Sequence, residues 1–190
     1  MADQAVRMQA LINDLLTLSR LEGSPLPDFT ELVDLRALMV QCEAEARALS
    51  RMLHPSDDRP QRLTFAQLPG LALVGAPGEV RSAISNVVNN AVRYTPTGGA
   101  IDVRWHILPG GGARLDVTDT GTGIPPEHLS RLGERFYRVD RSRSRESGGT
   151  GLGLAITKHV VQRHGGELQI SSALGQGSCF SLLFPAQRVR

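Results

Sequence analysis

The stretch GGTGLGLAI at residues 148–156 places four glycines and a threonine directly before an apolar run. Glycine-rich turns at a helix start let main-chain N–H groups approach a phosphate. A P-loop would need Lys after its last glycine, and Leu154 stands there. A dinucleotide fingerprint would need a preceding strand, but residues 138–147 (RVDRSRSRES) are rich in Arg and Ser. The stretch therefore indicates a phosphate site of neither common kind.

A second polar pattern is SNVVNNAVRYT, within a run typical of a helix over 77–94. Asn86 and Asn90 are four residues apart and share a helix face, which Arg93 and Tyr94 continue. Asn is a poor helix former, so several in one helix need a reason. Their amide oxygens suit a hard cation such as Mg²⁺, and a solvated polar face is the alternative. The pattern alone leaves both open.

A third pattern, DVTDTGTGIP, begins at residue 116. Asp119 ends an alternating strand pattern, and Gly121 and Gly123 permit a close backbone approach to a ligand. A carboxylate here could accept a hydrogen bond from an exocyclic amine such as that of adenine. A plain Asp-Gly turn is the alternative.

The elements that must position these residues follow from periodicity. We expect helices over 3–22, 35–53, 77–94, 126–133 and 150–164, and a mobile loop over 138–149. Strands are expected at 31–35, 62–68 and 71–75, with hairpins pairing 100–108 with 113–119 and 166–172 with 178–184. Helices with mostly antiparallel strands predict the α/β class, as a two-layer α/β sandwich.

The first helix has an apolar stripe formed by Met8, Leu11, Leu15 and Leu18, broadened by Ile12 and Leu16. The segment EGSPLPD then breaks it. This pattern suits an interaction helix joined by a hinge to a folded domain. It suits equally a helix packed on its own domain, because a stripe does not name its partner.

Composition excludes several classes. The 190 residues carry 21 basic and 19 acidic side chains, a balance that excludes a general nucleic-acid binder. No apolar run reaches membrane-spanning length, and no signal peptide is visible, so we expect a cytoplasmic fragment without membrane contact. Cys42 and Cys179 suggest a reducing compartment and no disulfide or metal site.

Taken together, five motifs carry a family resemblance. NVVNNA, DTGTGIP, ERFYRVD, GGTGLGLAI and GQGSCF resemble, in order and spacing, the catalytic, ATP-binding domain of sensor histidine kinases, which has the Bergerat ATP-binding fold. LLTLSRLE resembles the second helix of that family's dimerisation and phosphoacceptor hairpin, and the overall texture resembles the phosphate-regulon subfamily. The implied domains are a truncated hairpin at 1–23, a linker at 24–30 and the catalytic domain at 31–187.

The resemblance implies roles for particular residues. Asn90 would bind Mg²⁺, with Asn86 near the phosphates and Arg138 completing the catalytic set. Asp119 would bind the adenine amine, supported by Ser178. The remaining residues would line the nucleotide or flank a lid over it: Arg93, Tyr94, Gly121, Gly123, Ile124, Phe136, Gly149, Thr150, Gly151, Leu152 and Gly153. Arg141, Arg143 and Arg145 could add positive charge near the phosphates, but a solvated loop is the favoured interpretation of each.

The resemblance also implies what is missing. None of the chain's five histidines has the family's phosphoacceptor context, so we expect ATP binding without self-phosphorylation. The acceptor would lie on an absent helix, which would normally cover the Met8–Leu18 stripe, and the bare stripe predicts self-association. The parent would be a homodimer anchored in the bacterial inner membrane, passing its phosphoryl group to a response regulator.

Two alternatives stay open at this point. One is a non-catalytic ATP-sensing module, as in anti-sigma-factor relatives of the fold. The other is a hydrolytic ATPase of repair or topoisomerase type. Relatives that hydrolyse ATP carry a Glu where Asn86 stands, and without that base transfer to a histidine is favoured.

Overall fold

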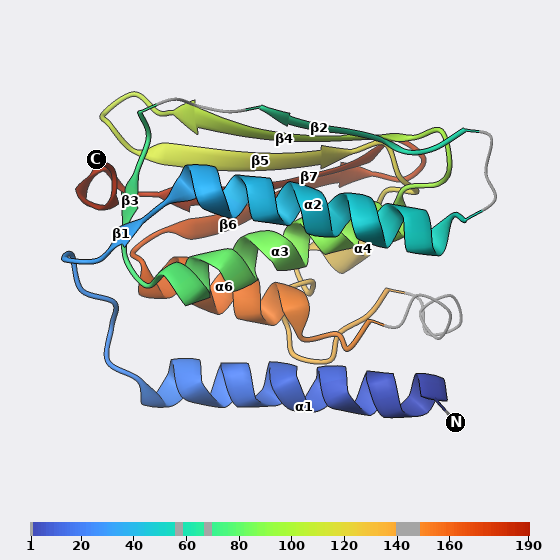
Figure 1. Cartoon of the computed structure of the whole chain (residues 1–190), viewed down its shortest axis with the longest axis horizontal. Coiled ribbons are helices and arrows are strands. Elements are labelled where there is room, and N and C mark those ends of the chain that lie inside the picture. Colours follow the sequence, from blue (N-terminus) through green and yellow to red (C-terminus); the bar gives the residue numbers. More distant parts are fainter. Residues whose placement is uncertain (1, 56–58, 67–69, 140–148) are drawn as a thin grey trace.

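The computed structural model describes residues 2–55, 59–66, 70–139 and 149–190. A five-stranded sheet, in the order β2-β4-β5-β7-β6, packs one face against helices α2, α3 and α6 (Figure 1). Strand β2 runs parallel to β4, and the other neighbours are antiparallel. The strands are β2 (Arg62–Ala66), β4 (Ala100–Ile107), β5 (Ala113–Asp119), β6 (Glu167–Ala173) and β7 (Gly177–Phe184). The helices are α2 (Leu35–Leu53), α3 (Pro77–Tyr94) and α6 (Gly153–Arg163). This confirms the expected two-layer α/β fold.

The core lies between the sheet and the helices. Alternate residues of the two central strands are buried, among them Ile101, Val103, Leu115 and Val117. Helix α3 supplies the facing surface, with Val80, Ile84, Val87, Val88 and Ala91 all buried. Pro77 stands in the first turn of α3, where a missing N–H costs nothing. Burial of this apolar stripe fixes which side chains α3 turns outward, and these include its asparagines.

Two short strands form a small sheet of their own. Strands β1 (Leu32–Val33) and β3 (Leu73–Val74) pair antiparallel with each other, apart from the main sheet. They are shorter than the predicted strands at 31–35 and 71–75, and β1 ends early because α2 already begins at Leu35, capped by the Asp34 side chain. A short 3₁₀ helix, η1 (Ala186–Arg188), follows the last strand.

Two further boundaries differ from expectation. Helix α4 (Pro126–Leu129) is a single turn, because the chain continues as consecutive turns rather than as a helix. Helix α6 begins at Gly153 and not at residue 150, because Gly151 has a φ of +76°, which an α-helix does not admit. Strand β2 follows the predicted strand 62–68 as far as Ala66, and residues 67–69 lie outside the described residues, as do 140–148 of the predicted loop.

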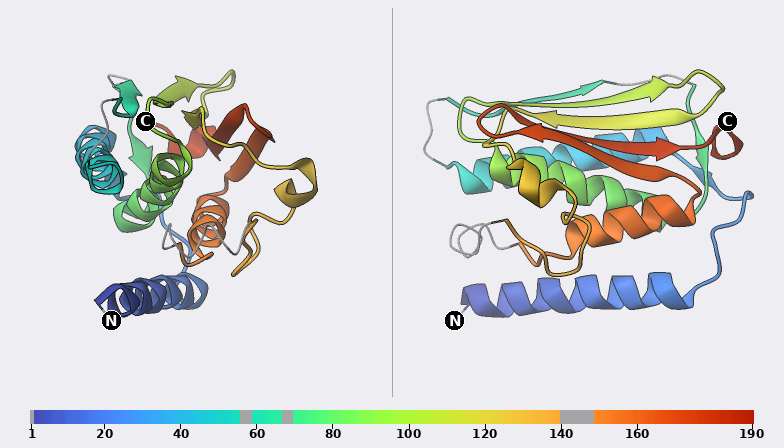
Figure 2. Two further views of the ribbon diagram at one scale, coloured as in Figure 1. Left: turned by 90° about the vertical axis from the view of Figure 1, so that its right-hand side faces the viewer. Right: turned by 180° about the vertical axis from the view of Figure 1, so that it is seen from behind.

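Helix α1 (Ala2–Gly23) lies outside the sandwich, on the side of α6 that faces away from the sheet (Figure 2). Leu18 and Leu21 are buried against the domain, and burying each stabilises the docked helix by about 2 kcal/mol. One face of this helix therefore packs on the chain's own domain, while Met8, Ile12, Leu15 and Leu16 stay exposed on the other. None of the described helices combines the length and apolar character needed to cross a membrane.

Candidate functional site

The glycine-rich turn is attached to helix α3 through Asn86. The Asn86 Nδ2 donates a hydrogen bond to the Gly153 carbonyl oxygen at 3.1 Å. A Cβ added at Gly153 would lie 3.3 Å from the Asn86 side chain, so this glycine lets the turn approach the helix closely. Thr157 adds a second bond between the helices, from its Oγ1 to the Ala83 carbonyl at 3.2 Å. Asn90 lies one turn further along α3 and is half-buried.

Asp119 stands at the end of β5 and is only 5% exposed. Burial raises the pKa of the Asp119 carboxyl, while bonds from the Gly121 and Ser178 main-chain N–H groups act in the opposite direction. The Gly121 N–H bond measures 2.8 Å. A carboxylate held in this way can accept a further hydrogen bond.

The Asp119 turn meets the other end of α3. Gly121 packs directly against the Tyr94 carbonyl, where a Cβ would not fit, and Thr122 N–H donates to that oxygen at 3.4 Å. Tyr94 is 46% exposed, and Arg93 is half-buried, which lowers the pKa of its guanidinium. Asn86 and Tyr94 therefore connect one helix to two separate loops.

Two serines support the adjoining Gly123–Ile124 backbone. Gly123 has a φ of +66° and packs against the Ala173 carbonyl, so a side chain is excluded there. The Ile124 N–H donates to Ser172 Oγ at 2.8 Å, and Ser172 Oγ lies 2.9 Å from Ser178 Oγ. Ser178 reaches Asp119 through its main-chain N–H. Sequence reasoning missed Ser172, although the alternation of strand β6 could have placed it beside Ser178.

Phe136 and Arg138 meet the glycine turn from the other side. The Phe136 N–H donates to the Gly151 carbonyl at 3.0 Å. Phe136 has a φ of +62°, uncommon for a non-glycine residue, and its side chain is 57% exposed. The Arg138 side chain lies beside Gly151 and Gly149. Arg141, Arg143 and Arg145 fall outside the described residues.

The turn itself makes one contact that the sequence did not predict. Thr150 Oγ1 donates to the Asp14 Oδ2 of α1 at 2.5 Å and accepts a bond from the Leu152 N–H at 3.3 Å. Leu152 is fully buried and anchors the start of α6. Asp14 is 136 residues away in sequence, and although it directly precedes the LLTLSRLE segment, no local signal indicates its contact with the glycine turn.

Two hollows lie elsewhere on the described surface. One, of 510 Å³, is lined by loops at the far end of the sheet, including Leu108 and Gly165. The other, of 320 Å³, lies between α4 and β6 and is lined by Lys158 and Ile170 among others. Neither contains Asn90, Asp119 or Thr150, so the candidate site is carried by the contacts above rather than by a closed cavity.

Residues 75–188 match the family described as histidine kinase-, DNA gyrase B- and HSP90-like ATPases. The chain belongs to this ATPase family. The matched range contains helix α3 with Asn86 and Asn90, the Asp119 turn and the glycine turn. Membership of this family implies that the domain binds ATP. The resemblance noted in the sequence is thereby confirmed.

Several members of the ATPase family are similar over nearly the whole chain. The phosphate regulon sensor protein PhoR of Pseudomonas aeruginosa is 49% identical over 188 residues, covering 98% of this chain and 41% of that protein. The sensor-like histidine kinase SenX3 of Mycolicibacterium smegmatis is 38% identical over 186 residues, covering 97% of this chain and 46% of that protein. The chain therefore spans less than half the length of these relatives.

Solved structures of this ATPase family show the same likeness. The mycobacterial sensor histidine kinase MprB matches with a TM-score of 0.66 and 30% identity, over 82% of this chain and 96% of that one. Full-length ShkA in complex with AMPPNP matches with a TM-score of 0.75 and 27% identity, over 94% of this chain and 35% of that one.

Proposed function

We propose that this chain is the catalytic domain of a sensor histidine kinase, which transfers the γ-phosphoryl group of MgATP to a histidine on a dimerisation hairpin. The observation that carries the proposal is that one helix, α3, contacts the Asp119 turn through Tyr94 and the glycine turn through Asn86. Phosphoryl transfer depends mainly on positioning and charge neutralisation, which a rigid helix between two ligand-binding loops supplies.

The adenine end is assigned to Asp119. Its carboxylate is buried and raised in pKa, so an N–H donor from a ligand would relieve an unfavourable burial. Gly121, Gly123 and Ile124 would form the floor of the base pocket, with Arg93 and Tyr94 at its edge. Ser178 supports this assignment because its N–H holds the carboxylate in place.

The phosphate end is assigned to the glycine turn and to the two asparagines. Main-chain N–H groups of Gly149 to Gly153 would face the phosphates at the start of α6. The Asn86 amide gives its N–H to Gly153, which leaves its Oδ1 as the atom able to face a cation. Oxygen ligands of this kind fit Mg²⁺, and we assign direct coordination to Asn90. Bound Mg²⁺ would neutralise phosphate charge.

Asn86 also favours transfer of the phosphoryl group over hydrolysis of ATP. An amide cannot take a proton from water, and the Asn86 side chain is already bonded to the turn. Phe136 and Arg138 touch the turn and would flank the lid, with Arg138 contributing positive charge near the transferred group.

The similar proteins support the cellular role. Likeness to a phosphate regulon sensor protein points to phosphate signalling, with relay to a response regulator. We place the acceptor histidine on a hairpin helix outside this sequence, in a homodimeric parent anchored in the inner membrane with this domain in the cytoplasm. No nucleic-acid partner is part of the proposal.

The test supplies a separate hairpin carrying an acceptor histidine, with γ-labelled ATP and Mg²⁺. We expect label on the hairpin and none on this chain alone. Asp119→Ala should abolish nucleotide binding, and Asn90→Ala should remove the Mg²⁺-dependent part of the affinity. Intact ATP binding without hairpin labelling would favour the ATP-sensing module. Steady phosphate release without an acceptor would favour a hydrolytic ATPase.

A further inference from the structure

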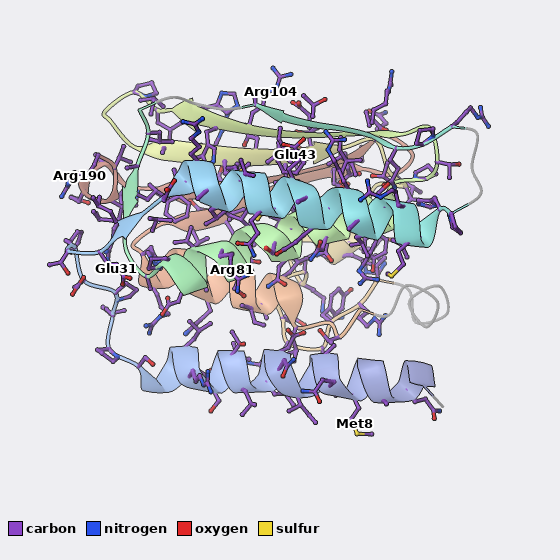
Figure 3. The ribbon with its side chains drawn as sticks, viewed as in Figure 1. Met8, Glu31, Glu43, Arg81, Arg104 and Arg190 are labelled. Atoms are coloured by element: carbon purple, nitrogen blue, oxygen red, sulfur yellow. The ribbon has the colours of Figure 1, made fainter. Side chains whose placement is uncertain are left out.

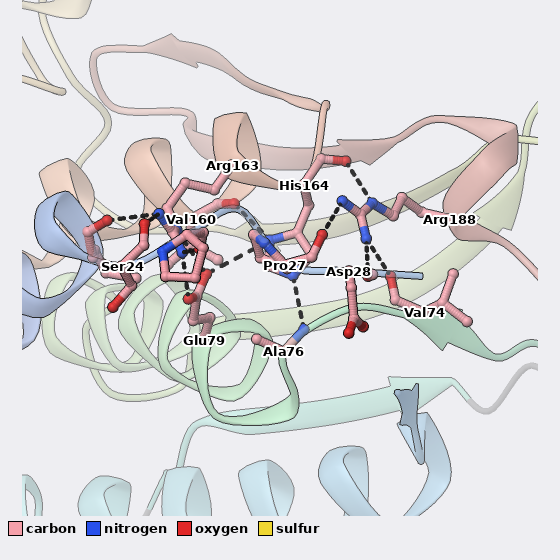
Figure 4. Close-up of polar contacts among 12 residues, drawn as sticks. Ser24, Pro27, Asp28, Val74, Ala76, Glu79, Val160, Arg163, His164 and Arg188 are labelled. Atoms are coloured by element: carbon pink, nitrogen blue, oxygen red, sulfur yellow. Dashed lines mark hydrogen bonds and ion pairs between the residues drawn. The ribbon is translucent and has the colours of Figure 1, made fainter. Parts of the chain in front are cut away.

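The linker after α1 is bound by a buried arginine of α6. Arg163 donates through Nη1 to the carbonyl oxygens of Leu21 at 2.7 Å and Ser24 at 3.1 Å, and through Nη2 to that of Pro25 at 2.6 Å. Its Nε and Nη2 each also donate to the Glu79 carboxylate, at 3.1 Å (Figure 4). Bonds from a charged donor are about twice as strong as neutral ones.

A second arginine, from the C-terminal 3₁₀ helix, binds the next part of the linker. Arg188 donates to the carbonyls of Pro27 at 2.8 Å and Asp28 at 2.5 Å, and its guanidinium stacks 3.9 Å from the centre of the Phe29 ring (Figure 4). The two arginines therefore bind five main-chain carbonyls of residues 21–28. The segment read as a hinge is a fixed strap, which sets where the C-terminal end of α1 lies.

From that fixed end, α1 extends along the outside of α6 toward the glycine turn (Figures 1 and 2). Leu18 and Leu21 are buried in this contact, and the half-buried Leu11 packs on the core. Glu22 forms an ion pair with Arg135, in the segment between α4 and the glycine turn. The helix is thus held between Leu11 and Glu22 by apolar and ionic contacts.

At the far end of the contact, Asp14 reaches the turn proposed to bind phosphate. The Asp14 carboxylate takes the Thr150 hydroxyl hydrogen at 2.5 Å, and the same hydroxyl oxygen occupies the Leu152 N–H at 3.3 Å. The Thr150 hydroxyl and the Leu152 N–H, which phosphate oxygens would otherwise use, are therefore already hydrogen-bonded. This series of hydrogen bonds ends on the Asp14 carboxylate. A carboxylate at this place also repels a triphosphate.

We propose that docked α1 is a built-in competitor of ATP, in which Asp14 takes the place of a phosphate at Thr150 while the arginine-bound strap keeps the helix attached. Nucleotide binding then requires the Asp14 half of α1 to leave the turn, and docking of that half lowers the affinity for ATP. This inference rests on the proposed function, because it needs the phosphates at the glycine turn.

The test measures ATP affinity by calorimetry, with Mg²⁺, in wild type, Asp14→Asn and Asp102→Asn. The last removes the same charge from the solvent-facing side of β4, where Asp102 pairs with Arg104. Asp14→Asn should bind ATP about threefold to tenfold more tightly, since one like charge is removed and the Thr150 hydroxyl keeps only a neutral, weaker acceptor, and Asp102→Asn should match wild type. ATP should also raise amide hydrogen exchange over residues 8–18 of wild type.

The outcomes separate the two proposals. Normal ATP binding by wild type with an unchanged or weaker affinity in Asp14→Asn overturns the competition, as does slower exchange in α1 when ATP binds. If no variant binds ATP, the proposed function itself fails, and the inference built on it falls too. Arg163→Met, which frees the strap, should reproduce the tighter binding if docking of α1 is the competing state.

Discussion

Asp119 is a buried carboxylate for which we have proposed a ligand-binding role. Its carboxylate is buried, and burial raises its pKa above the ordinary 3.8. A group whose pKa is raised on folding loses stabilisation as the pH rises through the folded value, so at neutral pH the ionised Asp119 destabilises the domain. Two main-chain N–H bonds offset part of this cost.

We therefore expect Asp119→Asn to separate stability from binding. The neutral amide can still accept the Gly121 N–H, so the free energy of unfolding should rise by on the order of 1 kcal/mol. ATP affinity should fall by about tenfold to a hundredfold, because an amide N–H would face the adenine amine. Urea denaturation and calorimetry on the same preparation measure both. A variant that loses stability and affinity together would show that Asp119 is a structural residue.

The residues that the sequence singled out as candidates share one property, which is that their signal is local. Asn86, Asp119 and Gly151 lie in motifs a few residues long, so residue type and spacing were sufficient to propose them as site residues. Asp14 acts through a contact with a segment far away in sequence, and a single sequence holds no record of such a pairing, whereas the predicted hairpin could have placed Ser172 beside Ser178.

At the scale of elements, long periodic segments were predicted to within a residue or two. Helix α3 matches its expected bounds because a dense apolar stripe and Pro77 both mark it. Helix α6 started later than expected because the left-handed Gly151 cannot belong to a helix. The linker was read as a hinge from its prolines and glycine, since nothing in it shows that distant arginines would bind its carbonyls.

His164 joins the end of α6 to the start of α3. Its Nδ1 lies 2.8 Å from the Val160 carbonyl, and its Nε2 accepts the Ala76 N–H at 3.2 Å, an arrangement that needs the neutral ring. Burial lowers the pKa of His164 below the ordinary 6.5; nearby Glu79 acts against this, and Arg188 and Arg163 add to it.

The sign of the resulting pH dependence follows from that shift. Below pH 6.5 His164 takes up a proton in the unfolded chain, whereas in the folded protein it stays neutral down to its lower folded pKa. As the pH is lowered from 6.5 to the folded pKa of His164, the free energy of unfolding should therefore fall. Above pH 6.5 the full contribution of His164 to stability should be present. Thermal melts at about pH 7.5 and about pH 5.5 compare wild type with His164→Gln, which should have a flatter dependence. His159→Gln, on the same helix, is the matched control. If the melting temperature of His164→Gln depended on pH as strongly as that of wild type, His164 would not be the group responsible.

At the scale of the whole molecule, α1 has two apolar faces and the domain covers one. Leu18 and Leu21 are buried, but Met8, Ile12, Leu15 and Leu16 are between 42% and 62% exposed. Figure 3 shows Met8 pointing away from the rest of the molecule. Docking on α6 therefore leaves a continuous strip of large apolar side chains in water, which favours association.

We expect this chain to self-associate through that strip. Replacing Ile12 and Leu16 with Lys should shift the sedimentation coefficient to that of a monomer at concentrations where wild type is larger. Val40→Lys is the matched control, because Val40 is a 54% exposed apolar residue on α2, in a different helix. The Ile12/Leu16 variant should keep the Asp14 contact, since that carboxylate is bonded to the opposite, domain-facing side of α1. If wild type sediments as a monomer at every concentration, docking on α6 is sufficient for α1, and its outer face is too small to hold a second copy.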